Sequence, residues 1–151
     1  TAYTGAALSV MGDGAVKNNF DVYGTCYAAK GTIASSDRAL KTKVAELQTE
    51  AAEDFILNLK PVEYAYKDDP GQMRHGFIAQ DVKQAMAGRK WGVYSDVKLR
   101  QTLDKDGNVQ EGKTIASVRY EEIIADLVKT VQSQHSRLCE LEKEVMGLGK
   151  D

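Results

Sequence analysis

The sequence predicts an α+β chain in three parts: a β-rich N-terminal stalk segment, a small mixed domain of helices and strands, and a long C-terminal helix of the coiled-coil type. Three observations lead to this division. Glycines crowd residues 1–35, helical and strand-like patterns alternate through residues 36–119, and the final part, residues 120–151, opens with a long run free of proline and glycine.

The composition supports a modest core and argues against several classes of partner. Of the 151 residues, 42% are hydrophobic, 7% are aromatic and 28% are charged. The net charge of −2 does not suit a nucleic-acid or membrane surface, which would need clustered basic charge. Cys26 and Cys139 lie far apart without C-x-x-C spacing, so we expect neither a disulfide nor a zinc site. No cofactor is expected, and a chain that begins at Thr1 is expected to be a piece of a longer protein.

The N-terminal segment has the pattern of a β-rich stalk. Residues 11–15 are expected to form a tight turn, and residues 20–23 and 25–27 are expected to be short strands. The segment holds too few large apolar residues to fold alone, so its partners are expected to be other chains. A disordered tail is the alternative, because the glycine content is high.

A helix is predicted after Ser36 and Asp37, which can cap its start. The helical pattern runs through Val44, Leu47, Ala51, Phe55, Ile56 and Leu59. It ends before Pro61, because the residue preceding a proline avoids the α-helical region.

The next stretch reads as strands with one short helix. Residues 62–66 alternate as a strand, and Asp-Asp-Pro-Gly at residues 68–71 is expected to be the turn that ends it. Residues 74–79 are a further strand candidate that leads into a helix over residues 80–86. Residues 91–100 and 114–118 are strand candidates, with a hairpin turn expected at residues 104–108.

The last element carries a heptad pattern. Its apolar residues alternate in steps of three and four, which is the spacing of a coiled-coil seam. The predicted seam is Ile124, Leu127, Val131, Gln134, Leu138, Leu141, Val145 and Leu148. A seam this narrow is expected to meet copies of itself, with Gln134 fixing register; the alternative is an amphipathic helix packed on its own domain.

Ser36 and Lys41 are candidates for a hydrolytic pair, because a lysine amine within reach can activate a serine hydroxyl. The interval of five residues is common, and the ordinary alternative makes Ser36 a helix cap and Lys41 a solvated residue. His75 precedes Gly76 at a strand-to-helix turn, where a structural histidine is the alternative to a catalytic one. His135 lies off the seam and is expected to be solvated.

The order of these motifs resembles the C-terminal intramolecular chaperone domain of bacteriophage endosialidases, tail spikes and tail fibres. Three runs carry the resemblance: Ser-Asp-Arg-Ala-Leu-Lys at residues 36–41, Leu-Lys-Pro-Val-Glu-Tyr-Ala-Tyr-Lys at residues 59–67, and His-Gly-Phe-Ile-Ala-Gln-Asp-Val at residues 75–82. A terminal heptad helix follows them. Here Arg38 directly follows Asp37, where the family usually has one residue between them.

The resemblance implies a self-cleaving serine endopeptidase that acts once, on its own chain. Three identical chains would associate through a trimeric coiled coil and hold the upstream stalk in register. Ser36 would then attack the carbonyl of Ser35 with Lys41 as base, so the bond between Ser35 and Ser36 would break. Because the two serines are adjacent, Ser35 is the alternative to Ser36 as the nucleophile.

The resemblance also implies supporting residues and a place of action. The supporting residues would be Asp37, Arg38, His75, Gly76 and Gln80. Assembly would occur in the host cytoplasm, after which the stalk remains in the virion tail and the chaperone is released. A trimerisation domain of a tail fibre without chemistry is the alternative function, and a hydrolase acting on outside substrates is a distant third.

Overall fold

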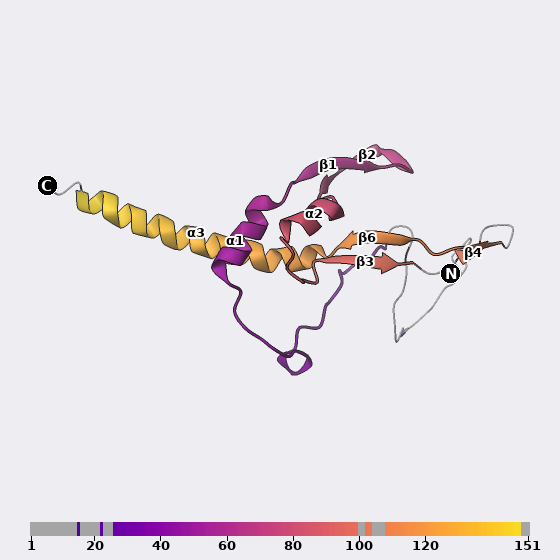
Figure 1. Cartoon of the computed structure of the whole chain (residues 1–151), viewed down its shortest axis with the longest axis horizontal. Coiled ribbons are helices and arrows are strands. Elements are labelled where there is room, and N and C mark those ends of the chain that lie inside the picture. Colours follow the sequence, from indigo (N-terminus) through magenta and orange to yellow (C-terminus); the bar gives the residue numbers. More distant parts are fainter. Residues whose placement is uncertain (1–14, 16–21, 23–25, 100–101, 104–107, 149–151) are drawn as a thin grey trace. The chain divides into compact units, whose positions relative to one another are not determined.

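The computed structural model describes residues 15, 22, 26–99, 102–103 and 108–148 (Figure 1). The chain divides into two compact units, Thr1–Ser35 and Ser36–Asp151. Within the described part of the first unit, residues 26–35 are exposed and hold a turn closed by a hydrogen bond from Gly31 N to Ala28 O, 3.0 Å. The turn predicted at residues 11–15 and the strand predicted at residues 20–23 lie almost wholly outside the described residues. Of the strand predicted at residues 25–27, the described part forms no strand.

The first helix of the second unit is shorter than predicted. A 3-10 turn, η1 (Arg38–Leu40), is followed by an exposed loop, and α1 begins only at Thr49 and ends at Asn58. The prediction of one helix from residue 36 was therefore wrong. Lys43 has a φ of 53°, in the left-handed region that a helix cannot continue through. Val44 and Leu47 are 55% and 41% exposed, so a helix at these residues would gain little stability from packing against a core.

An antiparallel hairpin of β1 (Val62–Tyr66) and β2 (Asp69–Gly76) follows α1. The strand predicted at residues 62–66 is confirmed, but the predicted turn was placed too late. The chain reverses at residues 67–68, and Pro70 and Gly71 already belong to β2. Proline fits there because it lies in a two-stranded sheet, where each strand has an open edge that needs no amide donor.

The remaining strands form two further two-stranded sheets within the described residues. Helix α2 (Ala79–Ala85) leads to β3 (Tyr94–Lys98), which pairs antiparallel with β6 (Thr114–Val118). Between them, β4 (Thr102–Leu103) pairs with β5 (Val109–Gln110). The hairpin turn predicted at residues 104–108 falls mostly outside the described residues.

Helix α3 (Tyr120–Leu148) confirms the predicted long C-terminal helix. Its first turns pack on α1, as Figure 1 shows. Ile123, Asp126 and Thr130 are the buried residues on this face of α3. None of the described helices is long and apolar enough to cross a bilayer.

The core is small and centres on the place where α1, α2 and the start of α3 meet. Its buried cluster is Phe55, Val82, Ala85, Met86, Val93 and Ile123, with Trp91 and Val118 among the partly buried residues around it. The rings of Phe55 and Trp91 meet edge to face, with centroids 5.4 Å apart. A core of this size contributes limited stability to one chain.

The predicted seam faces outward along α3. Ile124, Leu127, Val131, Leu138, Leu141 and Val145 are 47–67% exposed, and Gln134 is exposed as well. The side chain of the eighth predicted seam residue, Leu148, lies outside the described residues. The seam is therefore a different face from the one that packs on α1.

Candidate functional site

Ser36 and Lys41 lie in hydrogen-bond contact at the start of the second unit. Lys41 Nζ donates to Ser36 Oγ over 2.6 Å. The turn η1 brings them together: Leu40 N and Lys41 N donate to the carbonyls of Asp37 and Arg38, each over 3.1 Å. One 3-10 turn thus brings Ser36 and Lys41 together, although they are five positions apart in the sequence.

Asp37 caps this turn, so the Ser36 hydroxyl is left for another partner. The Asp37 carboxylate accepts a hydrogen bond from Ala39 N over 2.8 Å. The sequence allowed Ser36 to be the cap, and Asp37 has that role instead. Ser36 Oγ is consequently available to the Lys41 amine and can act as a nucleophile if that amine takes its proton.

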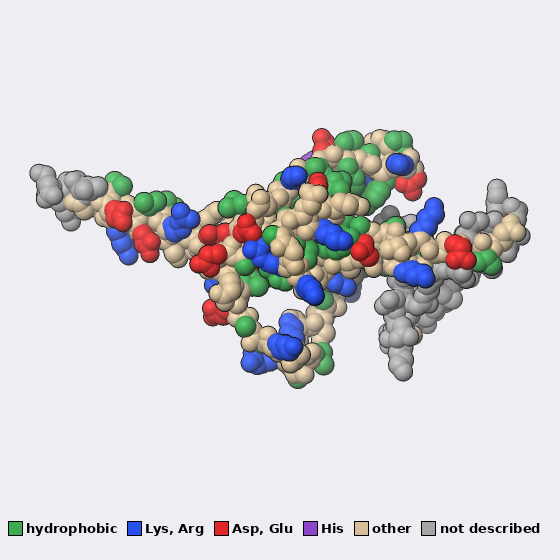
Figure 2. Space-filling view, in the orientation of Figure 1, with side chains coloured by type: hydrophobic (Ala, Val, Ile, Leu, Met, Phe, Trp, Pro, Cys, Tyr) green, Lys and Arg blue, Asp and Glu red, His purple; other side chains and the backbone are tan. Residues whose placement is uncertain are grey.

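The pair is exposed to solvent in the single chain. Every residue from 36 to 48 is exposed, including Leu40 at 74%. Figure 2 shows basic side chains gathered on this loop, which carries Arg38, Lys41 and Lys43. A lysine acts as a base only in its neutral form, and removal of water favours that form. In the single chain, this loop brings the Ser36 hydroxyl and the Lys41 amine into contact but does not bury either of them.

His75 lies on the hairpin beside Glu63. The two residues are cross-strand neighbours in the β1–β2 register, with His75 Nε2 3.7 Å from Glu63 Oε1. Their side chains are 86% and 60% exposed. A carboxylate in this position can orient the imidazole ring.

Gly76 is held in a tight contact with Tyr120, the first residue of α3. A Cβ placed on Gly76 would lie 2.5 Å from Tyr120 Oη and 3.2 Å from Tyr64 Cε1. The neighbouring Phe77 N donates a hydrogen bond to Tyr120 Oη over 3.1 Å. Glycine is required at this position because the phenol hydroxyl occupies the space of a side chain.

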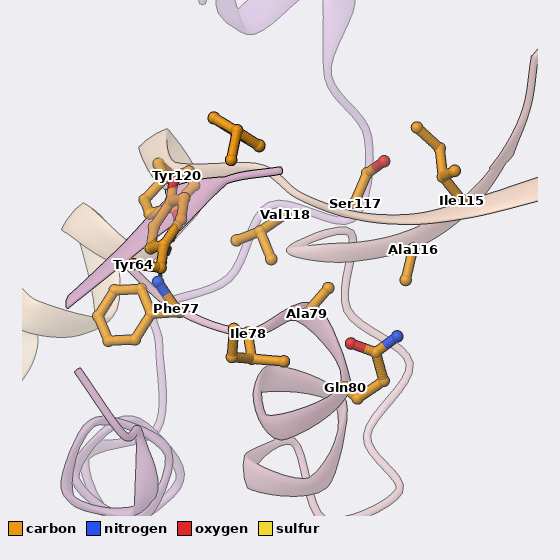
Figure 3. A pocket seen from close by; sticks show the side chains of 11 residues that line it. Tyr64, Phe77, Ile78, Ala79, Gln80, Ile115, Ala116, Ser117, Val118 and Tyr120 are labelled. Atoms are coloured by element: carbon orange, nitrogen blue, oxygen red, sulfur yellow. Dashed lines mark hydrogen bonds between the residues drawn. The ribbon is translucent and has the colours of Figure 1, made fainter. Parts of the chain in front are cut away.

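Gln80 lines an open cavity of about 480 Å³ beside this contact. Figure 3 shows Gln80 on α2 facing residues of β6, with Tyr64, Phe77 and Tyr120 gathered at the other end. The pKa of Tyr64 is raised, first by its hydrogen bond to Tyr66 and then by burial. The cavity is lined mostly by apolar groups, so we assign it no reaction.

The structure therefore brings together part of the predicted site. Ser36, Lys41 and Asp37 form one group, while His75, Gly76 and Gln80 lie around the β2–α2 junction. No hydrogen bond or ion pair between described residues joins the two groups. Arg38 belongs to η1 and is exposed.

Comparison with known protein families gives a match for part of the chain. Residues 36–89 match the Peptidase_S74 family, described as the chaperone of endosialidase. The match covers less than half of the 151 residues. A comparison with curated proteins found no match.

The matched chaperone segment begins at Ser36 and includes Lys41, His75, Gly76 and Gln80. It ends before β3, so the β3–β6 sheet and α3 lie beyond the match. Both groups of predicted site residues thus lie within the segment that matches the family, residues 36–89.

Two residues near the chaperone motifs were missed by the sequence reasoning. Glu63 could have been found, because β1 and β2 were both partly predicted and their pairing places it opposite His75. Tyr120 could not, since 43 residues separate it from Phe77 and nothing in the local pattern links them. A glycine at a strand end was the available signal, because it often marks a close approach of another group.

Proposed function

We propose that this chain is a self-cleaving intramolecular chaperone of a phage tail spike or tail fibre. The contact of Lys41 Nζ with Ser36 Oγ, 2.6 Å, carries the proposal, because it lies at the first residue of the segment that matches the chaperone family. The division of the chain between Ser35 and Ser36 also supports it. A bond between two compact units can be cut without breaking either one.

The proposed reaction uses the chain's own groups and one water molecule. Lys41, in its neutral form, takes the proton of Ser36 Oγ, and the oxygen attacks the carbonyl carbon of Ser35. The C–N bond between the two serines breaks, and the amine of Ser36 takes the proton from Lys41. The resulting ester joins the Ser35 carbonyl to Ser36 Oγ. Water then hydrolyses the ester to leave a carboxylate on Ser35 and a free hydroxyl on Ser36.

Association is proposed to come first and to run through α3. Nine of the exposed large hydrophobic residues in the described chain lie on this helix: Tyr120, Ile124, Leu127, Val128, Val131, Leu138, Leu141, Val145 and Met146. Figure 2 shows hydrophobic and charged side chains interspersed along the outer part of α3. Exposed apolar surface of this extent suits contact with further copies, and we propose a homotrimer.

The chaperone role follows from the order of these steps. Three stalk chains joined at one end meet at an effective concentration of about millimolar, so slow intermolecular pairing is helped. Cleavage then removes the template, after which the stalk persists because its barrier to unfolding is high. In this proposal assembly takes place in the host cytoplasm, and the stalk remains in the virion tail.

The test is the fate of the bond between Ser35 and Ser36 in freshly expressed chain. Mass spectrometry is expected to find products of residues 1–35 and 36–151, and Ser36→Ala and Lys41→Ala are expected to remain intact. Ser35→Ala is the matched control, since it keeps the proposed nucleophile and should still be cut. Hydroxylamine added during the reaction should yield a hydroxamate on Ser35, which reports the ester. Cleavage of Ser36→Ala at the same bond would contradict the proposal.

A second candidate function is a structural trimerisation domain that does not cleave. The exposure of Lys41 favours it, because a base of this kind works best where water is excluded. This candidate predicts an intact chain that associates through α3. The same mass measurement, combined with light scattering, separates the two functions.

A further inference from the structure

Helix α3 has two zones, which differ in how much of their surface is covered by the rest of the chain. In the first turns, Ile123 and Thr130 are 7% and 2% exposed because they pack against the helix's own domain. Beyond residue 133, only Cys139 among the described residues as far as Gly147 is partly buried, and the others are exposed. The outer zone, residues 134–147, can therefore be approached by another helix on both flanks of the seam.

The heptad assigns each flank a set of charges. With Ile124, Val131, Leu138 and Val145 at the a positions, Arg137 occupies a g position and Glu142 the next e position. These positions border the seam and contact a neighbouring helix in a coiled coil. Arg137 and Glu142 are both exposed, and neither has an ion-pair partner within the described chain.

The two residues cannot meet within one helix. They are five positions apart, and only residues three or four apart lie side by side on a helix. Between two parallel helices in register, by contrast, a g residue lies next to the e residue five positions further along the neighbouring helix. In an antiparallel pair, g positions face g positions and e positions face e positions, so Arg137 would not meet Glu142.

We propose that Arg137 of one copy pairs with Glu142 of a neighbouring copy and thereby fixes a parallel, in-register assembly of α3. The partner is a second copy of this chain, and the argument for it is charge complementarity across the seam. The inference rests on the proposed function, which supplies association through α3, and adds the orientation and the contact that sets it.

Gln134 supports the same register from inside the seam. In a parallel assembly without offset, the Gln134 side chains of all copies lie in one layer, where their amides can bond to each other. A shift by one heptad would place each amide against Leu141 or Leu127, leaving it without a polar partner. Burial of an amide in that state is costly. The inner layer and the outer ion pair thus favour one alignment.

Only this ion pair is available at the flanks of the described helix. The preceding g–e combination joins Thr130 to His135, but Thr130 is buried against its own domain. The one before it joins Ile123 to Val128, which are both apolar. Orientation would therefore depend on Arg137 and Glu142 more than on any other charged residues of the described flanks.

The alignment matters for the proposed cleavage. Parallel helices in register place the domains at one end of the assembly and at the same height. All Ser35–Ser36 bonds would then lie at one level, next to the stalk chains that they join. An antiparallel arrangement would send the stalk chains in opposite directions and could not template them.

The experiment compares Arg137→Glu, Glu142→Arg and the double variant, with the full chain and sedimentation at several concentrations. Each single variant puts like charges across the seam and is expected to associate about tenfold to a hundredfold more weakly at low salt. The double variant restores opposite charges and should associate like the unmodified chain. Glu140→Arg, at a position away from the seam, is the matched control and should change association little.

A mixing experiment gives a second readout. When Arg137→Glu and Glu142→Arg chains are combined, mixed oligomers have attractive contacts that neither pure oligomer has, so they should outnumber a random distribution. Circular dichroism checks that each variant keeps its helix.

Weakened single variants with restoration in the double variant, together with preferential mixing, are the supporting result. Equal association of all variants, or a double variant as weak as the singles, would overturn the ion pair while leaving association intact. An unmodified chain that stays monomeric at every concentration would instead refute the proposed function itself.

Discussion

Replacement of Gly76 by alanine tests the contact between the chaperone motif and α3. The added Cβ would lie 2.5 Å from Tyr120 Oη, closer than real Cβ contacts come, and 3.2 Å from Tyr64 Cε1. One of these rings must move, and displacement of packed groups typically costs about 1–3 kcal/mol. Gly76→Ala is therefore expected to lower the free energy of unfolding by an amount in that range.

Tyr120→Phe supplies the complementary change. It removes the hydroxyl that accepts the Phe77 amide, which is worth about 0.5–1.5 kcal/mol. It also removes the atom that the Gly76→Ala methyl group would strike, after which the nearest remaining contacts are 3.2 Å and 3.5 Å away. The double variant should thus be less destabilised than the sum of the two single variants.

The assay is urea unfolding of all four proteins at one protomer concentration, since association makes stability concentration-dependent. Gly71→Ala is the matched control, because Gly71 lies in the same strand and a Cβ there would meet nothing within 4 Å. It should be near neutral. Strictly additive losses, or a loss in Gly71→Ala equal to that in Gly76→Ala, would refute the steric argument.

Three further substitutions test the rest of the domain. Phe55→Ala removes the fully buried ring at the centre of the core and should cost about 3–5 kcal/mol in urea unfolding, while Leu57→Ala, at 71% exposed, should cost far less. Burial is the main cause that raises the pKa of Asp126; a hydrogen bond from its own backbone amide partly offsets this, and the nearby carboxylate of Glu122 adds a smaller rise, so the folded state resists ionisation of Asp126. The stability of the unmodified chain should therefore fall as the pH rises from about 4, the ordinary pKa of an aspartate, through the raised pKa of the folded state. Asp126→Asn should gain in stability relative to the unmodified chain over that rise, and a difference that stays constant with pH would contradict this. Arg89→Lys removes the guanidinium that lies 2.8 Å from the partly exposed carboxylate of Asp54. It should lower the free energy of unfolding by about 1 kcal/mol or less in the same urea assay, and a larger loss would show that the ion pair contributes more than a surface pair does.

The elements that the sequence predicted well are those with strong local patterns. Residues 62–66 alternate over a full strand, residues 114–118 were a strand candidate, and both strands occur with those bounds. The helix from Tyr120 follows from a long run without proline or glycine. These signals depend on neighbours in sequence, so no tertiary information is needed to find them.

The misplaced elements depended on contacts between distant residues. Val44 and Leu47 fit a helical period, but no core lies against them, and the backbone at Lys43 turns left-handed. The strand candidates at residues 91–100 and 114–118 do pair, as β3 and β6, but β3 is only Tyr94–Lys98 and the short β4–β5 pair lies between them. Ser36 and Lys41 are likewise joined by the 3-10 turn η1 and not by the start of the long helix that was predicted after Ser36.

The exposure of the dyad leads to the last prediction, which concerns the dependence of cleavage on assembly. Ser36 and Lys41 already touch in the single chain, so contact alone does not separate an active from an inactive state. What the single chain lacks is shielding of the amine from water, and a neighbouring copy is the natural source of it. Leu138→Asp, a change on the seam of α3 and far from the dyad in sequence, is therefore expected to abolish association and to slow cleavage at Ser35–Ser36 strongly. Lys143→Asp, on the outer face of the helix, should leave both unchanged. Cleavage of a monomeric Leu138→Asp chain at the normal rate, followed by mass spectrometry over time, would show that the dyad needs no partner.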